Sequence, residues 1–414
     1  MSSSRIKANG NWLTWARKMS QFKTSDIAKK MGVHSEDILN WEKTGEIRTS
    51  EVKKLAKYYH RPPMLFYNEN NPVNDYENIT DFRTINSLEK TELSPLIIKE
   101  LQNAKNKREN LIILEDESED FIIPEFKLSI DTKNNSIETI AQYIRERIGM
   151  TNAEIYNLKN SENALNHWIH KIEELGVLVF QFYDIDPVDM RGYAIYNKKL
   201  PIIGINKKEF PNGEKFTLFH ELVHLILNDE KISISNINKF KITNEKELIC
   251  NKIAAEILVP TKSLEIKLED YNNNGIWKDH HITALSKSFQ VSNEVILRRL
   301  LSLKKISKEF YYSKKEEWEK KYFASSANNL EKDKSKTKKK RKEKDKKIDK
   351  TENTYNSKKA TELLRKNGLL YTKLVLDAYD SRLITNNTLT DYLGTKLQVV
   401  NDIRKKIAKE NLEL

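Results

Sequence analysis

Cysteine is almost absent from this chain, whose 414 residues contain only Cys250. A single cysteine excludes an intramolecular disulfide and is typical of proteins in a reducing cytosol. No apolar stretch reaches the roughly 18 residues that a membrane-spanning helix needs. The N-terminus, Met1 to Arg5, lacks the apolar core of a secretory signal. We therefore expect a cytoplasmic protein that makes no contact with a membrane.

Excess positive charge is concentrated in one segment. The net charge is +12, and residues 331–350 hold twelve Lys and Arg against five Asp and Glu, so this run carries seven of those charges. The stretch 328–358 has almost no apolar residues and is predicted to be a disordered, solvated linker. Its lysines could still add nonspecific, salt-dependent affinity for phosphates. The remaining charge is weak evidence for a DNA-binding face.

The most informative motif is His220-Glu221-Leu222-Val223-His224, within an apolar run that has no Gly or Pro. Such a run predicts a helix that is buried on most of its faces. Residues four apart lie one above the other on a helix, so both imidazoles point into the same space, as two zinc ligands must. The alternative is a pair of hydrogen-bonded core histidines. Three buried titratable groups within five residues are costly, however, unless a metal compensates them.

A third ligand is expected from the segment 244–260, which reads as a second amphipathic helix that ends near Pro260. Its isoleucines and alanines form a face that can pack closely against the first helix. Either Glu245 or Glu247, in the first turns, could supply a carboxylate oxygen. Acidic residues are also favoured near a helix start by the helix dipole, so the spacing alone does not choose between them.

These motifs together resemble the ImmA/IrrE-type metallo-endopeptidases. The pattern of that family runs roughly R-F-T-L-A-H-E-x-x-H and then E-x-x-A-N-x-F-A-x-x-L-L-M-P. The resemblance implies Zn²⁺ held by His220, His224 and Glu247, and Glu221 as the catalytic carboxylate. The metal would lower the pKa of a bound water from about 15.7 to about 7, and Glu221 would take its proton. The departures from the pattern include Lys215, Phe219, Cys250 and Ile253, none of them a presumed ligand.

Flanking segments complete the expected peptidase domain. The β-branched runs 176–180 and 200–206 predict a small sheet, and 132–175 predicts helices that pack against it. Residues 282–300 look like a helix-turn-helix whose Arg298 and Arg299 could contact nucleic acid, but we interpret them as the helical tail of the peptidase. Two other histidine pairs could assist the reaction, although solvated or structural roles are simpler: His280 with His281, and His167 with His170.

The first seventy residues predict a different unit. Residues 24–43 read as a helix, a turn at Gly32 and a second helix capped by Ser35, which is the order of a helix-turn-helix. The sequence resembles the Cro/C1-type (XRE) family, whose pattern I-A-x-x-x-G-V-S-x-x-x-I-x-x-W-E is nearly spelled out. The resemblance implies binding to an operator in DNA. We expect contacts from five side chains: Lys23, Thr24, Ser35, Asn40 and Lys43.

DNA binding by this unit has an alternative. Glu36 and Asp37 place two carboxylates at the N-terminal end of the second helix, where donors or cations normally meet phosphates and bases. The unit could therefore be retained for contact with proteins. Asp81-Phe82-Arg83-Thr84 and the helix expected at 96–114 also recur in proteins that fuse these two kinds of domain. The acidic run 115–120 is interpreted as a solvated linker.

We expect an α+β chain that is mostly helical. A five-helix Cro/C1-type domain spans 1–70, a helical linker 71–130, a zincin-like peptidase domain with a small sheet and a helical tail 131–325, the Lys-rich linker 326–358 and a small helical domain 359–414. The chain could also form a homodimer.

Three functions remain open. The first is a zinc endopeptidase that cuts a helix-turn-helix repressor and so controls a stress or mobile-element programme. The second is a DNA-binding regulator whose zinc domain is a sensor or scaffold. The third is one half of a toxin–antitoxin or phage-defence pair, with the helix-turn-helix domain as the neutralising half.

Overall fold

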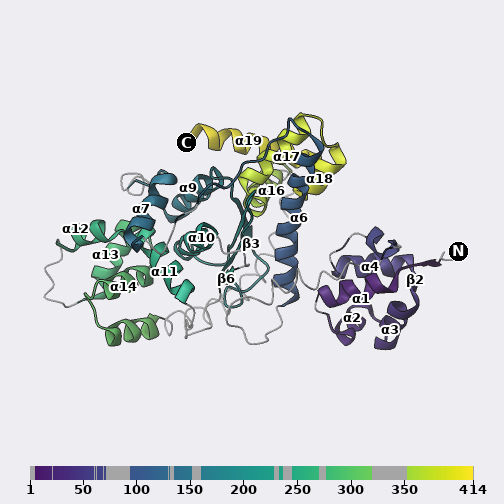
Figure 1. Cartoon of the computed structure of the whole chain (residues 1–414), viewed down its shortest axis with the longest axis horizontal. Coiled ribbons are helices and arrows are strands. Elements are labelled where there is room, and N and C mark those ends of the chain that lie inside the picture. Colours follow the sequence, from purple (N-terminus) through teal and green to yellow (C-terminus); the bar gives the residue numbers. More distant parts are fainter. Residues whose placement is uncertain are drawn as a thin grey trace, which may run out of the picture. The chain divides into compact units, whose positions relative to one another are not determined.

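The computed structural model describes residues 5–20, 22–59, 61, 63–68, 70, 94–128, 130, 135–151, 160–227, 233–235, 245–269, 277–318 and 352–413. The expectations for Asp81 to Thr84, and for most of the Lys-rich linker, lie outside these residues. The chain divides into two compact units (Figure 1). The first contains Met1–Lys107 and Lys231–Ser233, and the second contains Arg108–Glu230 and Ile234–Leu414.

The N-terminal part of the first unit is helical, as expected. It contains α1 (Gly10–Met19), α2 (Thr24–Met31), α3 (Ser35–Thr44), α4 (Thr49–Tyr59) and the 3-10 helix η1 (Pro63–Tyr67). A two-stranded antiparallel sheet of β1 (Arg5–Lys7) and β2 (Glu46–Arg48), which was not predicted, is added to these helices. Leu13 and Ala16 of α1 are buried and pack with Ile27, Ile38 and Trp41 in one apolar core.

An ion pair and two caps define α3. Arg17 of α1 donates Nε and Nη2 to the carboxylate of Glu42, at 2.6 and 2.9 Å, which ties α1 to the end of α3. The prediction that Ser35 caps α3 is wrong, because the cap is His34. The backbone N–H of His34 donates to Asp37 Oδ2 at 2.9 Å, so the acid three residues on completes a capping box. Gly45 ends the helix with φ +71°.

Strands β3, β5 and β4 form the centre of the second unit, in a sheet with the strand order β3-β5-β4-β6. The expected strands are present as β3 (Leu178–Phe182) and β5 (Ile202–Asn206), which pair in parallel. Two strands were not predicted: β4 (Gly192–Ile195), which is antiparallel to β5, and β6 (Ser233–Ser235). Strands β3, β4 and β5 are buried along their whole length, so they lack the alternation that marks a half-exposed strand.

Helices cover this sheet (Figure 1). Helix α10 (Pro211–Ile226) packs against β4 and β5, and α9 (Ser161–Glu173) packs against α10 and β3. Helix α11 (Glu245–Leu258) lies between α10 and α7 (Ile137–Arg147). Pro211 opens α10 at a position where its missing N–H costs no hydrogen bond. The helices expected within 132–175 are thus confirmed as α7 and α9.

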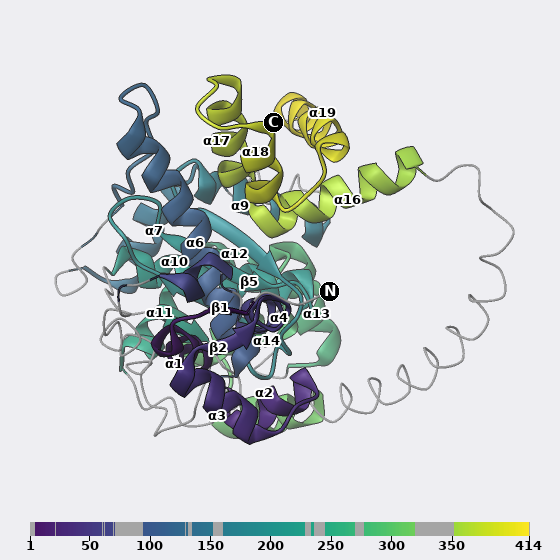
Figure 2. The same cartoon turned by 90° about the vertical axis from the view of Figure 1, so that its right-hand side faces the viewer.

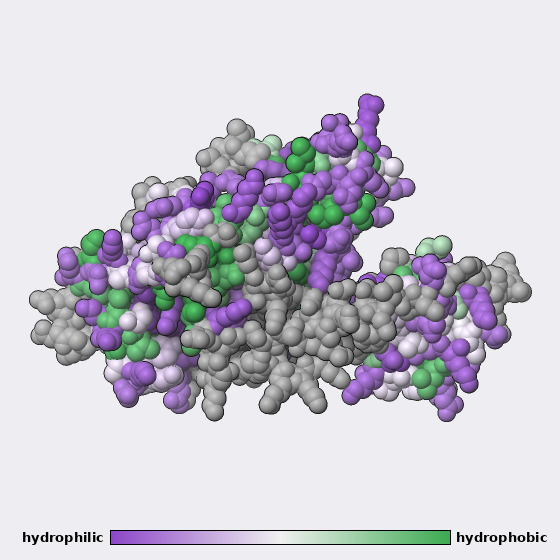
Figure 3. All heavy atoms as spheres, viewed as in Figure 1, coloured by the Kyte–Doolittle hydropathy of each residue, from purple (hydrophilic) through white to green (hydrophobic). Residues whose placement is uncertain are grey.

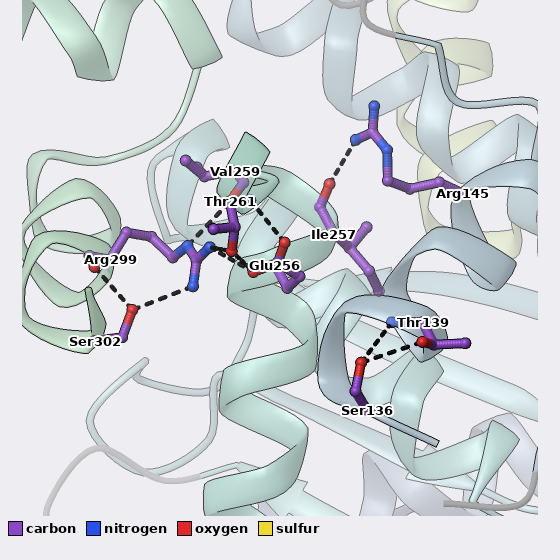
Figure 4. Close-up of polar contacts among 9 residues, drawn as sticks. All are labelled: Ser136, Thr139, Arg145, Glu256, Ile257, Val259, Thr261, Arg299 and Ser302. Carbon is purple, nitrogen blue, oxygen red and sulfur yellow. Dashed lines mark hydrogen bonds and ion pairs between the residues drawn. The ribbon is translucent and has the colours of Figure 1, made fainter. Parts of the chain in front are cut away.

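The helical tail consists of α12 (Thr261–Glu269), α13 (Asp279–Phe289) and α14 (Asn293–Ser302). Arg299 of α14 is only 6% exposed, and its guanidinium bonds to Glu256 and to the carbonyl of Val259 (Figure 4). Arg298 pairs with Glu294 one helical turn away. The geometry of Arg299 therefore matches the scaffold interpretation rather than a contact with nucleic acid.

Helix α6 (Pro95–Glu117) includes the stretch that was expected to be helical. The interpretation of 115–120 as a solvated linker is wrong for its first residues, which belong to this helix. Glu115 accepts from Lys199 Nζ at 2.6 Å and from the backbone N–H of Ile123 at 3.3 Å. These two hydrogen bonds hold the Glu115 side chain against the protein surface, so it does not extend into solvent.

Four C-terminal helices belong to the same unit as the sheet: α16 (Glu352–Asn367), α17 (Leu369–Asp380), α18 (Asn386–Leu393) and α19 (Leu397–Glu413). They gather into one cluster, drawn in yellow in Figure 2. Residues 352–358 were predicted to be disordered, but they form the start of α16, which packs against β3 and α19. Gly368, with φ +74°, lets this cluster approach the sheet, because an added Cβ would lie 2.5 Å from the carbonyl oxygen of Val179.

Among the residues that the structure describes, no helix combines the length and the apolar character required to cross a bilayer. Hydrophilic side chains predominate on the face shown in Figure 3, and the hydrophobic ones form separate patches. The mostly helical α+β architecture is as predicted.

Candidate metal centre

Helix α10 carries both histidines of the motif at its core. Its residues 217–226 are buried throughout, so the helix is a rigid interior element rather than a surface one. His220 and His224 are 4% and 3% exposed. Their Nε2 atoms lie 3.1 Å apart, with the ring planes 68° from one another. The expected i, i+4 geometry is therefore present, and both rings direct the same nitrogen to one point.

Helix α11 brings the acidic group to this point. Glu247 places Oε2 3.2 Å from His220 Nε2 and Oε1 3.2 Å from His224 Nε2. The side chain of Glu245, the other candidate for the third ligand, lies outside the described residues. The structure thus brings together the three residues that the family resemblance implied as ligands, from two helices in contact.

The three side chains fit a divalent ion. Two ligand atoms about 2.0–2.1 Å from a tetrahedral zinc ion lie roughly 3.3 Å from one another. The two Nε2 atoms are 3.1 Å apart, and each lies 3.2 Å from a different oxygen of Glu247, so the distances are of this size. Two imidazole nitrogens and one carboxylate oxygen are also a set of donors that zinc uses in catalytic sites. These residues could therefore hold a metal with little movement of their side chains.

Charge at the site is arranged around Glu247. Burial alone would raise the pKa of its carboxyl group, but hydrogen bonds from His220 and His224 outweigh burial and hold that pKa well below its usual range. Cys250, one turn further along α11, is fully buried, and burial raises the pKa of its thiol although His224 opposes this. The site thus holds an ionised carboxylate beside a neutral thiol.

Glu221 is fully buried on the sheet side of α10. It lies next to Gly192, the first residue of β4: a Cβ added to Gly192 would be 3.3 Å from Glu221 Oε1 and 2.4 Å from Thr217 Cγ2. The absence of a side chain at Gly192 therefore allows β4 to pass directly over the carboxylate of Glu221. Sequence reasoning missed this residue. The signal that could have indicated it is an isolated glycine at the start of a short apolar run, which often marks a close approach of two elements.

Polar contacts fix α10 against β4. Arg191, just before β4, pairs with Glu209 at 3.0 Å, and Glu209 accepts from Thr217 Oγ1 at 3.1 Å. On the other side of the helix, Lys215 is 2% exposed and donates to the carbonyl of Gln290. Burial lowers the pKa of Lys215 to about 8. These contacts hold the first turns of α10 and so position the histidines that follow.

The other histidine pairs lie elsewhere in the second unit. His280 and His281 are on α13, stacked edge to face at 4.1 Å, and neither belongs to the metal-ligating group found among the described residues. His167 and His170 are on α9. Neither pair therefore gains support for a catalytic role.

Four of the five side chains predicted to contact DNA are exposed, and Thr24 is half-buried. They lie at the start of α2 and along α3. Gly32, which joins α2 to the turn before α3, has φ +70°, a conformation that glycine adopts without strain. The helix, turn and helix are thus in the expected order, and the assignment to the Cro/C1 family stays a prediction.

Comparison with known proteins supports the peptidase part. Residues 172–301 match the peptidase M78 family, in a region described as the IrrE N-terminal-like domain. No curated protein matches the chain. The matched segment contains β3 to β5, α10, α11 and the tail helices through most of α14, and hence all three members of the metal-ligating group. The chain therefore contains a region similar to a metallopeptidase domain.

Proposed function

We propose that this protein is a zinc-dependent endopeptidase that regulates transcription by cutting a DNA-binding repressor. The observation that supports this most strongly is the convergence of His220, His224 and Glu247 on one point, beside the buried carboxylate of Glu221. A site used only to hold structure would be expected to enclose the metal with four protein ligands. Among the described residues, three ligand side chains converge, which would suit an ion that also binds water.

The residues would share the work as follows. A bound zinc ion supplies Lewis acidity, which activates water and polarises a peptide carbonyl. Glu221 accepts the proton of the attacking water and later passes it to the leaving amine. Glu247 and the two histidines would hold the cation. Strand β4, which passes over Glu221 at Gly192, shields the carboxylate from bulk water. The products are a new carboxyl end and a new amino end of the substrate.

The N-terminal unit would bind an operator through α3. Asn40 and Lys43 are exposed on this helix and could contact bases and phosphates. Asp37 accepts the capping hydrogen bond from the backbone N–H of His34, but its carboxylate stays charged, so both Glu36 and Asp37 oppose binding to phosphates. A protease tethered at the operator of its substrate meets that substrate at a raised effective concentration. We place this activity in the cytoplasm, with a helix-turn-helix repressor as substrate and a homodimer as one form of the enzyme.

A change of Glu221 to Gln tests the proposal. It removes the base but leaves the three ligands, and Glu265→Gln, on the exposed face of α12, is a matched control. Cells that express each form are compared by mass spectrometry of protein N-termini. We expect new N-termini in a DNA-binding protein with the wild type and with Glu265→Gln, and none with Glu221→Gln.

The competing function is a DNA-binding regulator whose zinc domain is a scaffold. It predicts that Glu221→Gln keeps full control of the regulated genes while no protein is cut. Operator occupancy and transcript levels, measured for the same variants, separate the two functions. Unchanged transcripts with Glu221→Gln would contradict regulation by cleavage.

A further inference from the structure

A cavity of about 270 Å³ lies in the second unit, away from the metal centre. It is open to solvent on one side and is lined by residues of α9, β3, α16 and α19, with Gly368 and Leu369 at the corner between α16 and α17. Its volume is just below the roughly 300–1,000 Å³ usual for small-molecule sites. Apolar walls are formed by Ile169, Val179, Leu364 and Leu369, and apart from Gly368 the remaining lining is polar or charged.

The inner lining of this cavity offers hydrogen-bond acceptors. Gln181 of β3 is 3% exposed, and its Oε1 atom has no hydrogen-bond partner among the described residues. Glu173 of α9 is 4% exposed, and its Oε1 atom accepts from the backbone N–H of Leu370 at 3.1 Å. A buried acceptor without a donor is destabilising, so a ligand that carries an N–H or O–H group would relieve this cost.

The outer lining is positive. Lys406 and Lys409 lie one turn apart on α19, and neither has an ion-pair partner within the part of the chain that is described. Arg365 of α16 is the third cation, and it is paired with Glu162 of α9 at 2.6 Å. The lining thus combines three cations with a buried acceptor oxygen that has no partner among the described residues.

We propose that this cavity binds a small metabolite with a phosphate or carboxylate group at one end and an N–H or O–H donor at the other. The anionic group meets Lys406, Lys409 and Arg365, since charge-assisted hydrogen bonds to anions are stronger than neutral ones. The donor meets Gln181. The site is separate from the metal centre and does not depend on the proposed peptidase activity.

Within the protein, Glu162 would compete with a bound anion for the guanidinium of Arg365. Glu162, which holds Arg365, also lies 3.9 Å from Lys207 Nζ, and Lys207 pairs with Glu214 in the first turn of α10 at 3.1 Å. An anion in the cavity would compete with Glu162 for the guanidinium. Replacing Glu162 with Gln should therefore release Arg365 and raise the affinity for the anion.

Isothermal titration calorimetry on the full chain tests the proposal. The probes are adenosine and uridine 5′-monophosphate for the phosphate source, L-glutamine for the carboxylate source, and inorganic phosphate as a probe without the donor end. We expect at least one organic probe to bind. Lys406→Glu and Lys409→Glu should each weaken that binding by about tenfold or more, because each removes a charge-assisted contact and places a like charge beside the anion. Glu162→Gln should strengthen it several-fold.

Lys405→Glu is the matched control, since Lys405 is an exposed lysine on the same helix that does not line the cavity. It should leave the affinity close to that of the wild type. Gln181→Leu should weaken the organic probe and leave inorganic phosphate unchanged. Circular dichroism confirms that each variant is folded.

Two results would overturn the proposal. One is that no probe binds up to millimolar concentration. The other is that Lys405→Glu weakens binding as much as Lys406→Glu does, which would mean a diffuse surface attraction. Equal affinity for inorganic phosphate and the organic probes, unaffected by Gln181→Leu, would contradict the donor end of the site.

Discussion

Arg299 of α14 and Glu256 of α11 form an ion pair in which both side chains are buried, at 7% and 6% exposure (Figure 4). The same guanidinium donates Nε to the carbonyl of Val259 at 2.9 Å, and Glu256 accepts from the backbone N–H of Thr261 at 2.7 Å. The pair therefore provides hydrogen-bond partners for backbone groups at the end of α11 and at the start of α12. Because α11 carries Glu247, this network also holds one side of the metal centre.

The first prediction concerns this pair. Arg299→Ala should lower the free energy of unfolding by about 3–5 kcal/mol, since it leaves the carboxylate of Glu256 buried without its cation. Arg298→Ala is the control, because its pair with Glu294 is partly exposed and should contribute only about 0–1 kcal/mol. Urea denaturation measures both. If the two variants lost similar free energies of unfolding, the burial of the Arg299 pair would not add to its stabilising effect.

The second prediction contrasts two glycines. Gly192→Ala forces a methyl group to within 2.4 Å of Thr217 Cγ2, so β4 or α10 must shift, at a cost of about 1–3 kcal/mol. Gly213→Ala, in the first turns of α10, meets atoms no nearer than 3.6 Å and should stabilise the protein by about 0.5–1 kcal/mol. Thermal unfolding gives the sign of each change. A destabilised Gly213→Ala or a neutral Gly192→Ala would contradict the packing described for this wall.

The third prediction is a pH dependence at His170, which lines the cavity. Burial, together with the charge of Lys373, lowers the pKa of His170 to about 4, although Glu174 opposes this; His167 and Lys171 also face the ring. The pKa of His170 is lower in the folded protein than in the unfolded chain, so the unfolded chain binds a proton more readily. The folded state is therefore most stable, relative to the unfolded chain, above about pH 6.5. It loses stability as the pH falls from 6.5 towards 4. Between pH 7 and pH 5 the wild type should lose roughly 2 kcal/mol more than His170→Gln. Parallel curves of stability against pH for the two proteins would refute this assignment.

The fourth prediction concerns DNA. If α3 contacts an operator, Lys43→Ala should weaken binding and reduce the slope of log K against log salt by about 0.9, which is the loss of one phosphate contact. Lys57→Ala, on the exposed side of α4, serves as the matched control. The experiment measures fluorescence anisotropy of operator DNA at several salt concentrations. Equal slopes for both variants would favour a role of the N-terminal unit in contact with proteins.

Local spacing explains why part of the site was predictable. His220 and His224 lie on one helix, so their mutual geometry follows from four residues of sequence. The choice between Glu245 and Glu247 depends on how α11 lies against α10, and only the family resemblance anticipated it. Strand β4 was not predicted because it has only four residues and begins with a glycine. Gly192 is needed for a close contact with α10, and no local sequence pattern reveals that contact.

Distant contacts explain what could not be predicted. The cavity is formed by residues about 240 positions apart, from Asn166 to Lys409, and no periodicity links them. The seven residues 352–358 are polar enough to resemble the preceding Lys-rich run, yet they begin a helix whose later turns pack on β3. Propensity alone does not indicate this, because the stabilisation comes from tertiary packing further along the same helix.

The most direct test of the account is the metal content of purified full-length protein, measured by inductively coupled plasma mass spectrometry after incubation with Zn²⁺ and removal of excess ion. We expect about one zinc ion per chain in the wild type and in Glu221→Gln, and a large loss in His224→Ala and in Glu247→Ala, because a three-ligand site does not survive the loss of one ligand. A wild-type protein that retains no zinc would contradict the account.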